Sequence, residues 1–287
     1  KMMSFVVGNH VVVDRRLWLN SKGICVDDRL RLTRSVSRVL RLRRKTTAAR
    51  IEMRSEKQEL GSELQLIKVC GISCGEDAKI VVDKARDILP LHVKLYLGMI
   101  IWPKSVRSVN HETAKEIVSV ARDSGVSSVG VFVDESADEM YESYKEYGID
   151  FVQMHGVKSR RARSALAAMN VPLIDVVDVY SDGSYSCKGV EEQESDVEWT
   201  LFDAKGGGTG TAFDWNSFKN PASVNAAYTN RWMLAGGLNP DNIADAVRSL
   251  RPPALDVASG VADKDRVRKD PARVELFLKR AVDAYSQ

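Results

Sequence analysis

The chain has 287 residues, of which 44% are hydrophobic and 28% are charged, and its net charge is +3. These proportions are typical of a globular protein with a substantial core, and the length suits one large α/β domain or two small ones. No apolar run reaches the roughly 18 residues of a membrane span, so we expect no membrane association. The four cysteines fit neither a disulfide framework nor a paired Cys-x-x-Cys zinc site, which favours a reducing compartment; they are Cys25, Cys70, Cys74 and Cys187.

The first 65 residues differ from the remainder in charge. They contain 15 Lys and Arg against 7 Asp and Glu, whereas residues 66–287 contain 27 against 32. Between Arg29 and Arg54 there are ten basic residues and one acid, Glu52, with several Ser and Thr. Sequence that is rich in Arg and hydroxyl groups and poor in acids is typical of organelle transit peptides. We therefore expect residues 1–65 to be a basic leader, either a transit peptide or a disordered extension.

Two other interpretations of the leader remain open. It could be a solvated charged helix without a partner, or an arm that binds nucleic acid. The second is disfavoured because the aromatic residues and glycines of an RNA-binding segment are missing.

From Leu66 onward, a short β-rich run alternates eight times with a longer amphipathic stretch. The expected strands are residues 66–72, 95–101, 128–133, 151–155, 172–179, 200–203, 232–235 and 254–258. The expected helices are residues 76–89, 111–124, 137–147 and 159–169, a weak one near Glu191, one around Trp215, and residues 240–250 and 271–285. Eight βαβ units in about 220 residues predict an α/β fold, a (β/α)8 TIM barrel over residues 66–287.

An open, doubly wound sheet is the structural rival. It usually has five or six strands and a G-x-G-x-x-G fingerprint after the first of them. Here the first strand is followed by Cys70-Gly-Ile-Ser-Cys-Gly75, which lacks that spacing.

Two residues at expected strand ends could do chemistry. Cys70 ends the first strand and Asp203 the sixth, and a barrel gathers the carboxyl ends of its strands around one bowl. A thiol and a carboxylic acid can move protons at a sugar carbon if the thiol loses its proton near neutral pH and the acid keeps its own. No metal and no cofactor are then expected. A buried inert cysteine and an ordinary Asp-Gly turn are the alternatives.

Glycines point to an anionic substrate and a lid. Those from Gly206 to Gly210 follow Asp203 and can move as a lid, with Gly207 and Gly208 against the substrate. The loops after strands seven and eight commonly bind phosphate in such barrels, and residues 261–265 could form the short extra helix of that site. The expected phosphate ligands are Gly236, Gly237, Ser259 and Gly260.

Three more side chains stand near strand ends. Arg107, in a Pro-Lys-Ser-Val-Arg turn after strand two, could clamp a carboxylate with two hydrogen bonds, although it could also be a surface arginine. Asp256, three residues before Ser259, is expected to orient the phosphate loop. His155 ends strand four, and we expect it to be structural because Cys70 and Asp203 already supply base and acid.

Seven segments carry a family resemblance. They are Lys68-Val-Cys-Gly-Ile72, Gly98-Met-Ile-Ile-Trp-Pro-Lys-Ser-Val-Arg107, Val129-Gly-Val-Phe-Val-Asp134, Val152-Gln-Met-His-Gly156, Phe202-Asp-Ala-Lys-Gly-Gly-Gly-Thr-Gly210, Leu234-Ala-Gly-Gly-Leu238 and Asp256-Val-Ala-Ser-Gly-Val261. In this order, and along about residues 66–287, they closely resemble the phosphoribosylanthranilate isomerase family of tryptophan biosynthesis. Each segment alone is weak evidence, but seven in register are strong evidence.

The resemblance implies an activity and roles for residues. It implies a barrel that converts N-(5-phosphoribosyl)anthranilate into 1-(2-carboxyphenylamino)-1-deoxyribulose 5-phosphate by an Amadori rearrangement, with Cys70 as general base and Asp203 as general acid. Arg107 would hold the anthranilate carboxylate, and the glycine loops the 5-phosphate. The chain departs from the family at Ser73, Ala204 and Ala258, and only Ala258, which replaces the first serine of a Ser-Ser-Gly loop, touches a binding role.

The resemblance also bears on partners and location. It implies a small phosphosugar-anthranilate substrate, no nucleic acid, and a monomer or homodimer. Because plants import their tryptophan enzymes into plastids, the leader and the resemblance together imply the plastid, or the cytoplasm if the leader is not a transit peptide. The rivals are another phosphosugar barrel, such as indole-glycerol-phosphate synthase or ribulose-phosphate epimerase, and an RNA-binding protein that uses the basic arm.

Overall fold

The computed structural model describes residues 63–186, 197–206, 212–225 and 231–287, together with four short strands near the N-terminus. These strands form two antiparallel hairpins that the sequence analysis did not predict: β1 (Met3–Val6) pairs with β2 (Val12–Arg15), and β3 (Trp18–Asn20) with β4 (Gly23–Cys25). The chain divides into two units, Lys1–Leu60 and Gly61–Gln287. The basic stretch from Arg29 to Arg54 lies outside the described residues.

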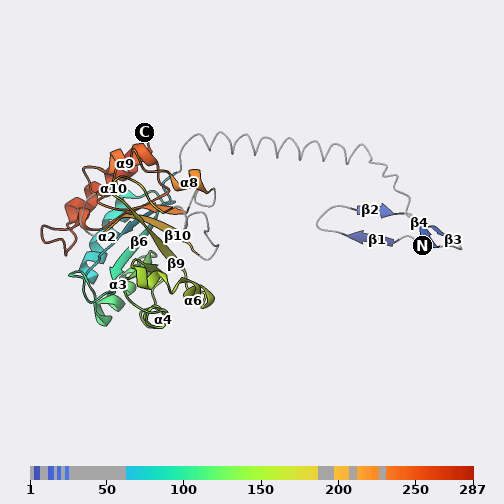
Figure 1. The fold of residues 1–287 in the computed structure, drawn as a ribbon, viewed down its shortest axis with the longest axis horizontal. Helices are drawn as coiled ribbons and strands as arrows, with labels where there is room; N and C mark the ends of the chain where they lie inside the picture. The colour runs from blue at the N-terminus through green and yellow to red at the C-terminus, as the bar shows by residue number, and fades with distance from the viewer. Residues whose placement is uncertain are drawn as a thin grey trace. The chain divides into compact units, whose positions relative to one another are not determined.

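The second unit contains eight parallel strands closed into a barrel (Figure 1). They are β5 (Leu66–Val69), β6 (Lys94–Ile100), β7 (Ser127–Phe132), β8 (Phe151–Met154), β9 (Leu173–Val179), β10 (Trp199–Ala204), β11 (Trp232–Leu234) and β12 (Ala254–Val257). Strands adjacent in sequence pair with each other, and β12 closes on β5 with Asp256 opposite Lys68. The predicted (β/α)8 barrel is confirmed.

Most helices agree with the sequence prediction. They are α2 (Gly75–Ile88), α3 (His111–Asp123), α4 (Ala137–Tyr147), α9 (Ile243–Leu250) and α10 (Pro271–Tyr285). Four of them begin at a side chain that accepts a hydrogen bond from an amide of the first turn, which fixes where each helix starts. These capping residues are Cys74, Asn110, Ser136 and Asp270.

Three helix predictions differ from the structure. The helix expected over residues 159–169 is two short ones, α5 (Val157–Arg160) and α6 (Arg163–Ala168). Around Trp215 the chain makes a turn, because the Asp214 carboxylate accepts hydrogen bonds from the Asn216 amide and the Ser217 hydroxyl; a single helical turn, α8 (Pro221–Val224), follows. The weak helix expected near Glu191 lies outside the described residues.

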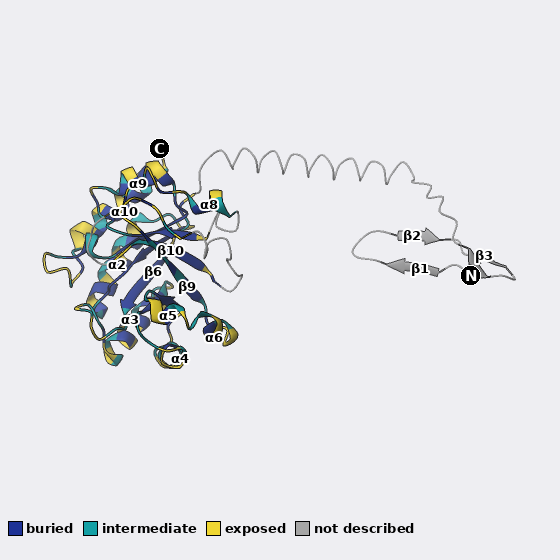
Figure 2. Ribbon diagram, viewed as in Figure 1, coloured by how far each residue is buried: buried dark blue, intermediate teal, exposed yellow. Residues whose placement is uncertain are grey.

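Apolar side chains pack in two regions. The larger region lies between the strands and the surrounding helices, and Figure 2 shows the buried residues on the strands and on the helix faces turned toward them. The smaller region fills the barrel interior. At one level of this interior, Leu66, Ala254, Met233 and Leu201 lie opposite one another on four adjacent strands.

Polar residues replace this apolar layer at the next inward-facing level. Two residues further along the same strands come Lys68, Asp256, Ala235 and Asp203. Since side chains alternate between the two faces of a strand, these residues face the same interior. The barrel interior is therefore apolar toward the amino ends of the strands and holds ionisable side chains toward their carboxyl ends.

Candidate active site

The predicted base and acid lie on the same side of the barrel. Cys70 directly follows β5 and Asp203 belongs to β10, and the two strands are separated by β11 and β12. Both side chains are largely buried: Cys70 is 7% exposed, and the Asp203 side chain 13%. The Cys70 amide donates to the Val257 carbonyl at 2.8 Å, which extends the β5–β12 pairing to the end of the strand.

Asp203 is suited to hold a proton near neutral pH. Burial, followed by the negative charge of Asp256, raises its pKa from 3.8 to about 7. Its Oδ2 atom lies 3.5 Å from Nε2 of His155. Burial lowers the pKa of His155, so the imidazole is neutral and adds no full charge beside the acid.

Gln153 lies beside the ring nitrogen of His155 that is turned away from Asp203. The Gln153 amide nitrogen lies 3.2 Å from Nδ1 of the ring. With that amide as donor, Nδ1 accepts and the proton resides on Nε2, facing Asp203. We expected His155 to have a structural role from the sequence; in the structure its Nε2 atom lies beside Asp203, the proposed acid.

A buried ion pair joins β5, the strand that leads to the base, to its neighbour β12. The Lys68 ammonium donates to Oδ1 of Asp256 at 2.9 Å, and neither side chain is more than 9% exposed. Burial works to lower the pKa of Lys68, but the charges of Asp256 and Cys70 together raise it. Asp256 therefore lies inside the barrel, paired with Lys68, and among the described residues its carboxylate makes no hydrogen bond or ion pair with the predicted phosphate loop.

Gly98 on β6 makes room for the Cys70 thiol. A Cβ atom at this position would lie 2.9 Å from Sγ of Cys70 and 3.1 Å from Cε of Lys68. A carbon atom is not tolerated that close to sulfur without movement, so a side chain there would displace the base. Gly98 was not among the predicted site residues, although it is the one glycine in β6.

Arg107 lies beside the residue that follows the base. Its Nη1 atom is buried and has no hydrogen-bond partner among the described residues. A Cβ on Gly71, which has φ +69°, would lie 2.7 Å from that atom. A buried donor without a partner is costly, so the guanidinium is prepared for an anion that is not part of the protein.

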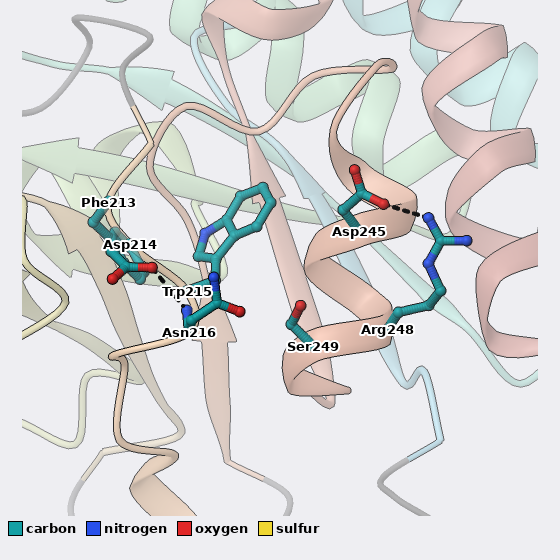
Figure 3. A pocket seen from close by; sticks show the side chains of 7 residues that line it. All are labelled: Phe213, Asp214, Trp215, Asn216, Asp245, Arg248 and Ser249. Atoms are coloured by element: carbon teal, nitrogen blue, oxygen red, sulfur yellow. Dashed lines mark hydrogen bonds and ion pairs between the residues drawn. The ribbon is translucent and has the colours of Figure 1, made fainter.

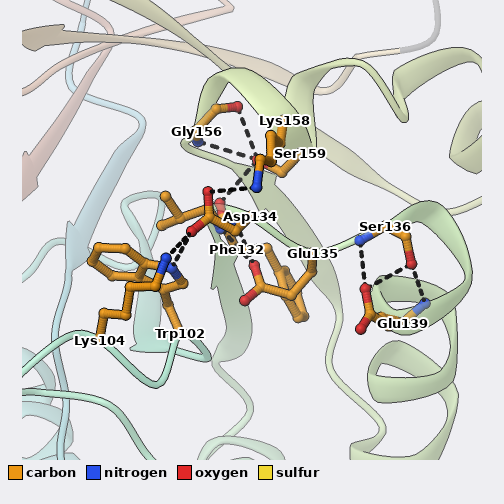
Figure 4. Close-up of polar contacts among 11 residues, drawn as sticks. Trp102, Lys104, Phe132, Asp134, Glu135, Ser136, Glu139, Gly156, Lys158 and Ser159 are labelled. Atoms are coloured by element: carbon orange, nitrogen blue, oxygen red, sulfur yellow. Dashed lines mark hydrogen bonds and ion pairs between the residues drawn. The ribbon is translucent and has the colours of Figure 1, made fainter.

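The loop that carries Arg107 is fixed by Asp134, which follows β7 (Figure 4). Its Oδ2 atom accepts from the Trp102 indole at 3.0 Å and from the Lys104 ammonium at 2.9 Å. The hydrogen bonds from Lys104 and then Trp102 lower the pKa of Asp134, so it is ionised at neutral pH. Lys158, after β8, lies 3.9 Å from its other oxygen.

The predicted phosphate loops meet at the ends of β11 and β12. Gly236 and Gly237 have φ values of +86° and +67°, which favour glycine. A Cβ on Gly260 would lie 1.9 Å from the Leu238 carbonyl oxygen, so only glycine fits there. The extra helical turn expected over residues 261–265 is not found there; a 3-10 turn, η2 (Ser259–Val261), comes just before it and shares only Val261 with the predicted range.

A cavity of about 520 Å³ opens at this place. Gly237, Ser259 and Gly260 line it, as do the basic side chains of Lys264 and Arg266. Backbone amides at the start of a short helical turn, with cations nearby, form a typical anion site.

Most of the predicted lid lies outside the described residues. Gly207 and Gly208 lie in the segment 207–211, outside the described residues, as does Cys187. Gly206 is described, with φ +97° and open space where a Cβ would stand.

A second cavity, of about 450 Å³, lies between the turn at Trp215 and α9 (Figure 3). The Asn216 amide donates to Asp214, and Asp245 pairs with Arg248 on the helix. It contains none of the residues predicted for the site.

Within the described part of the chain, no group of three or more His, Cys, Asp or Glu is placed to hold a metal ion. Among the same residues, no helix has the length and apolar character needed to cross a bilayer.

Comparison with known proteins gives one consistent result. The family described as "N-(5'phosphoribosyl)anthranilate (PRA) isomerase" matches residues 67–280. Two proteins of Arabidopsis thaliana, N-(5'-phosphoribosyl)anthranilate isomerases 1 and 2, both named chloroplastic, are each 36% identical over 220 residues, which is 77% of this chain and 76% of theirs.

Solved structures of the same family resemble the barrel of this chain. Phosphoribosyl anthranilate isomerase from Thermus thermophilus superposes with a TM-score of 0.62 at 26% identity, over 76% of this chain and 98% of that one. A phosphoribosyl anthranilate isomerase in complex with reduced 1-(o-carboxyphenylamino)-1-deoxyribulose 5-phosphate has a TM-score of 0.57 at 27% identity, over the same shares.

Proposed function

The chain belongs to the N-(5'-phosphoribosyl)anthranilate isomerase family, and from this we propose that Cys70 and Asp203 are the base and acid with which it isomerises its substrate. The reaction is the conversion of N-(5'-phosphoribosyl)anthranilate to 1-(2-carboxyphenylamino)-1-deoxyribulose 5-phosphate, a step of tryptophan biosynthesis. The observation that carries the proposal is an aspartic acid whose pKa is raised to about 7, on the same rim as a buried free cysteine.

Asp203 acts first. Its carboxyl group donates a proton to the ring oxygen of the aminofuranose, the bond from C1 to that oxygen breaks, and the nitrogen lone pair forms the C1 iminium. A carboxyl group can be a general acid only while protonated, and the raised pKa keeps it so up to about pH 7. His155, neutral and 3.5 Å away, orients the carboxyl group without ionising it.

Cys70 acts second. Its thiolate removes the proton from C2, the electron pair forms the C1–C2 double bond, and the iminium nitrogen recovers its lone pair. The resulting enolamine then gains a proton at C1 and loses the one on the C2 hydroxyl, which gives the ketone. The Lys68 ammonium interacts with Cys70 and stabilises the charge of the thiolate.

The charged ends of the substrate set its orientation. The unpartnered Nη1 atom of Arg107 supports a role in binding the anthranilate carboxylate. We place the 5-phosphate on the loops of Gly236, Gly237, Ser259 and Gly260, at the cavity that Lys264 and Arg266 also line. Gly207 and Gly208 stay a prediction as parts of a lid.

One assay tests these roles. Isomerase activity is measured for the wild type, Cys70→Ala, Asp203→Asn and Arg107→Met, with Cys74→Ser, at the start of α2, and Asp245→Asn, on α9, as matched controls. We expect kcat to fall by at least 10²-fold in the first two variants and KM to rise by about 10²-fold in the third. Full activity of Cys70→Ala or Asp203→Asn refutes that residue's role, and an inactive wild type refutes the function.

We extend the proposal to location. The Arabidopsis thaliana relatives are chloroplastic, and the basic, acid-poor leader has the composition of a transit peptide. Residues 1–65 fused to a fluorescent protein should enter isolated chloroplasts and be cleaved. A fusion with the basic residues 29–54 changed to glutamine is the control, and equal import of both would contradict the targeting role. A monomer or homodimer, and the absence of a nucleic-acid partner, stay predictions.

A further inference from the structure

Lys269 is a buried cation that the reaction scheme does not use. Only 3% of the residue is exposed. No carboxylate lies within ion-pair distance of it in the described structure; its ammonium donates instead to the carbonyl oxygens of Cys70 at 2.7 Å and Ala258 at 3.0 Å. Burying an ammonium without a counterion is costly, so packing alone does not explain a lysine here.

The surrounding chain holds Lys269 in place from both sides. Lys269 pairs with Ala262 across a small hairpin, and the Asp270 amide donates to the Val261 carbonyl at 3.0 Å. Asp270 in turn caps α10. The long side chain therefore starts from a rigid position and has little freedom to find other acceptors.

The two acceptors are functionally distinct. One is the main chain of the proposed base, and the other is the residue that leads into the phosphate loop at η2. The amide of Cys70 is bonded to β12 and its carbonyl to Lys269, so both polar groups of its main chain are fixed. We propose that Lys269 is a positioning residue for the base: it ties the Cys70 main chain to the phosphate loop, and its charge stabilises the thiolate.

The charge part of the proposal follows from covalent geometry. Four bonds separate Sγ of a cysteine from its own carbonyl oxygen, so an ammonium on that oxygen lies within about 7 Å of the sulfur. Burial lowers the pKa of Lys269 to about 8, and the charge of Cys70 opposes that shift. The other charged groups that face Lys269 are Arg107, Asp77 on α2 and Asp256 on β12; Lys68 faces Cys70 from β5.

The inference rests on Cys70 being the base, so the test measures the thiol without measuring activity. Iodoacetamide alkylation of Cys70 is followed against pH by mass spectrometry in the full chain. Cys70 and Cys74 share the tryptic peptide 69–79, so Cys74→Ser is the background; serine also caps a helix. In Lys269→Met the alkylation curve should be displaced to higher pH, because the ammonium that lies on the Cys70 carbonyl is gone.

Kinetics separate positioning from simple packing. In Lys269→Met, kcat should fall at least tenfold and the acid limb of the pH profile should move upward, with KM changed less than threefold. Lys269→Arg keeps the charge and should restore the acid limb. Lys279→Met is the matched control, because it removes an exposed lysine that pairs with Glu275 on α10. A folded Lys269→Met with the wild-type alkylation curve and kcat overturns the proposal.

A reciprocal measurement does not need Lys269→Met to fold. Because the coupling acts equally in both directions, the pKa of Lys269 should fall when Cys70 becomes serine, as read from the carbon resonances of labelled lysine. An unchanged Lys269 pKa in Cys70→Ser overturns the charge coupling. If instead the wild type is inactive or Cys70→Ala is fully active, the proposed function fails. The alkylation and resonance results then still test whether Lys269 and Cys70 interact.

Discussion

Replacing Asp256 with asparagine should move the alkaline limit of activity to lower pH. Asp203 and Asp256 lie at one level of the barrel with only β11 between their strands. Two strand spacings are roughly 10 Å, and two charges at that distance interact by about 1.7 kcal/mol at an effective dielectric constant near 20, or about 1.2 pKa units. Lys68, whose charge lowers the pKa of Asp203, also loses its counterion, so both effects have the same sign.

The sign follows from the role of the acid. The pKa of Asp203 is raised to about 7, so the carboxyl group keeps its proton below that pH and activity falls as the pH rises through it. In Asp256→Asn the carboxyl group ionises about one unit lower, and the basic limb of kcat/KM should move with it. The profile is measured from pH 5 to 9, with circular dichroism at each pH to verify folding.

Asp178→Asn is the matched control. Asp178 is closer along the sheet, since it pairs with Asp203 in register, but its side chain is 40% exposed and bonded to Arg160. Solvent and the arginine screen it, so we expect a smaller shift than for Asp256→Asn. A basic limb that stays in place in folded Asp256→Asn, or that moves upward, would refute the electrostatic reasoning.

Three further outcomes follow from the structure. Asp203→Asn should be inactive yet more stable at pH 8. The raised pKa makes the wild type lose about 4 kcal/mol of unfolding free energy between roughly pH 4 and 7, of which about 2.7 kcal/mol falls between pH 5 and 8, and urea unfolding at these two pH values should show that smaller loss only in the wild type. Gly98→Ala should cost about 1–3 kcal/mol and most of kcat, because its Cβ meets the Cys70 thiol; a wild-type melting temperature and rate would contradict this. Ala258→Ser should restore one hydroxyl at the phosphate loop and lower KM about fivefold, from about 1 kcal/mol of hydrogen bonding, and an unchanged KM would show that the hydroxyl does not reach the phosphate.

The barrel could be predicted from the sequence because its signal is local and repeated. Every strand combines apolar or β-branched residues with a following glycine, proline or acidic turn. The signal of one strand is weak, but eight repetitions of it together predict the barrel. The helix around Trp215 failed because a single side chain, that of Asp214, supplies two hydrogen bonds that favour a turn. Both contacts are local, so the Asp-Trp-Asn-Ser sequence itself is compatible with a turn, whereas the helical periodicity of the segment does not reveal it.

The site was predictable only in part. Cys70 and Asp203 could be proposed as site residues because they stand at the ends of strands, and Arg107 because it lies in the loop after β6. The partners of these residues could not, because Lys68 meets Asp256 across 188 residues and Lys269 meets Cys70 across 199. The one available signal was spacing: Lys68 stands two residues before Cys70, so alternation on a strand puts both on the inner face.

The long separation within the Lys68–Asp256 pair has a consequence for biosynthesis. Whether the chain leaves a ribosome or an import pore, its N-terminal end comes first, so Lys68 on β5 emerges 188 residues before its partner on the strand that closes against it. During that interval the lysine stays hydrated, and one edge of the growing sheet has no neighbour. Pairing of β12 with β5 is therefore the last strand pairing the chain can make. This step removes Lys68 from water and closes the barrel around the candidate active site.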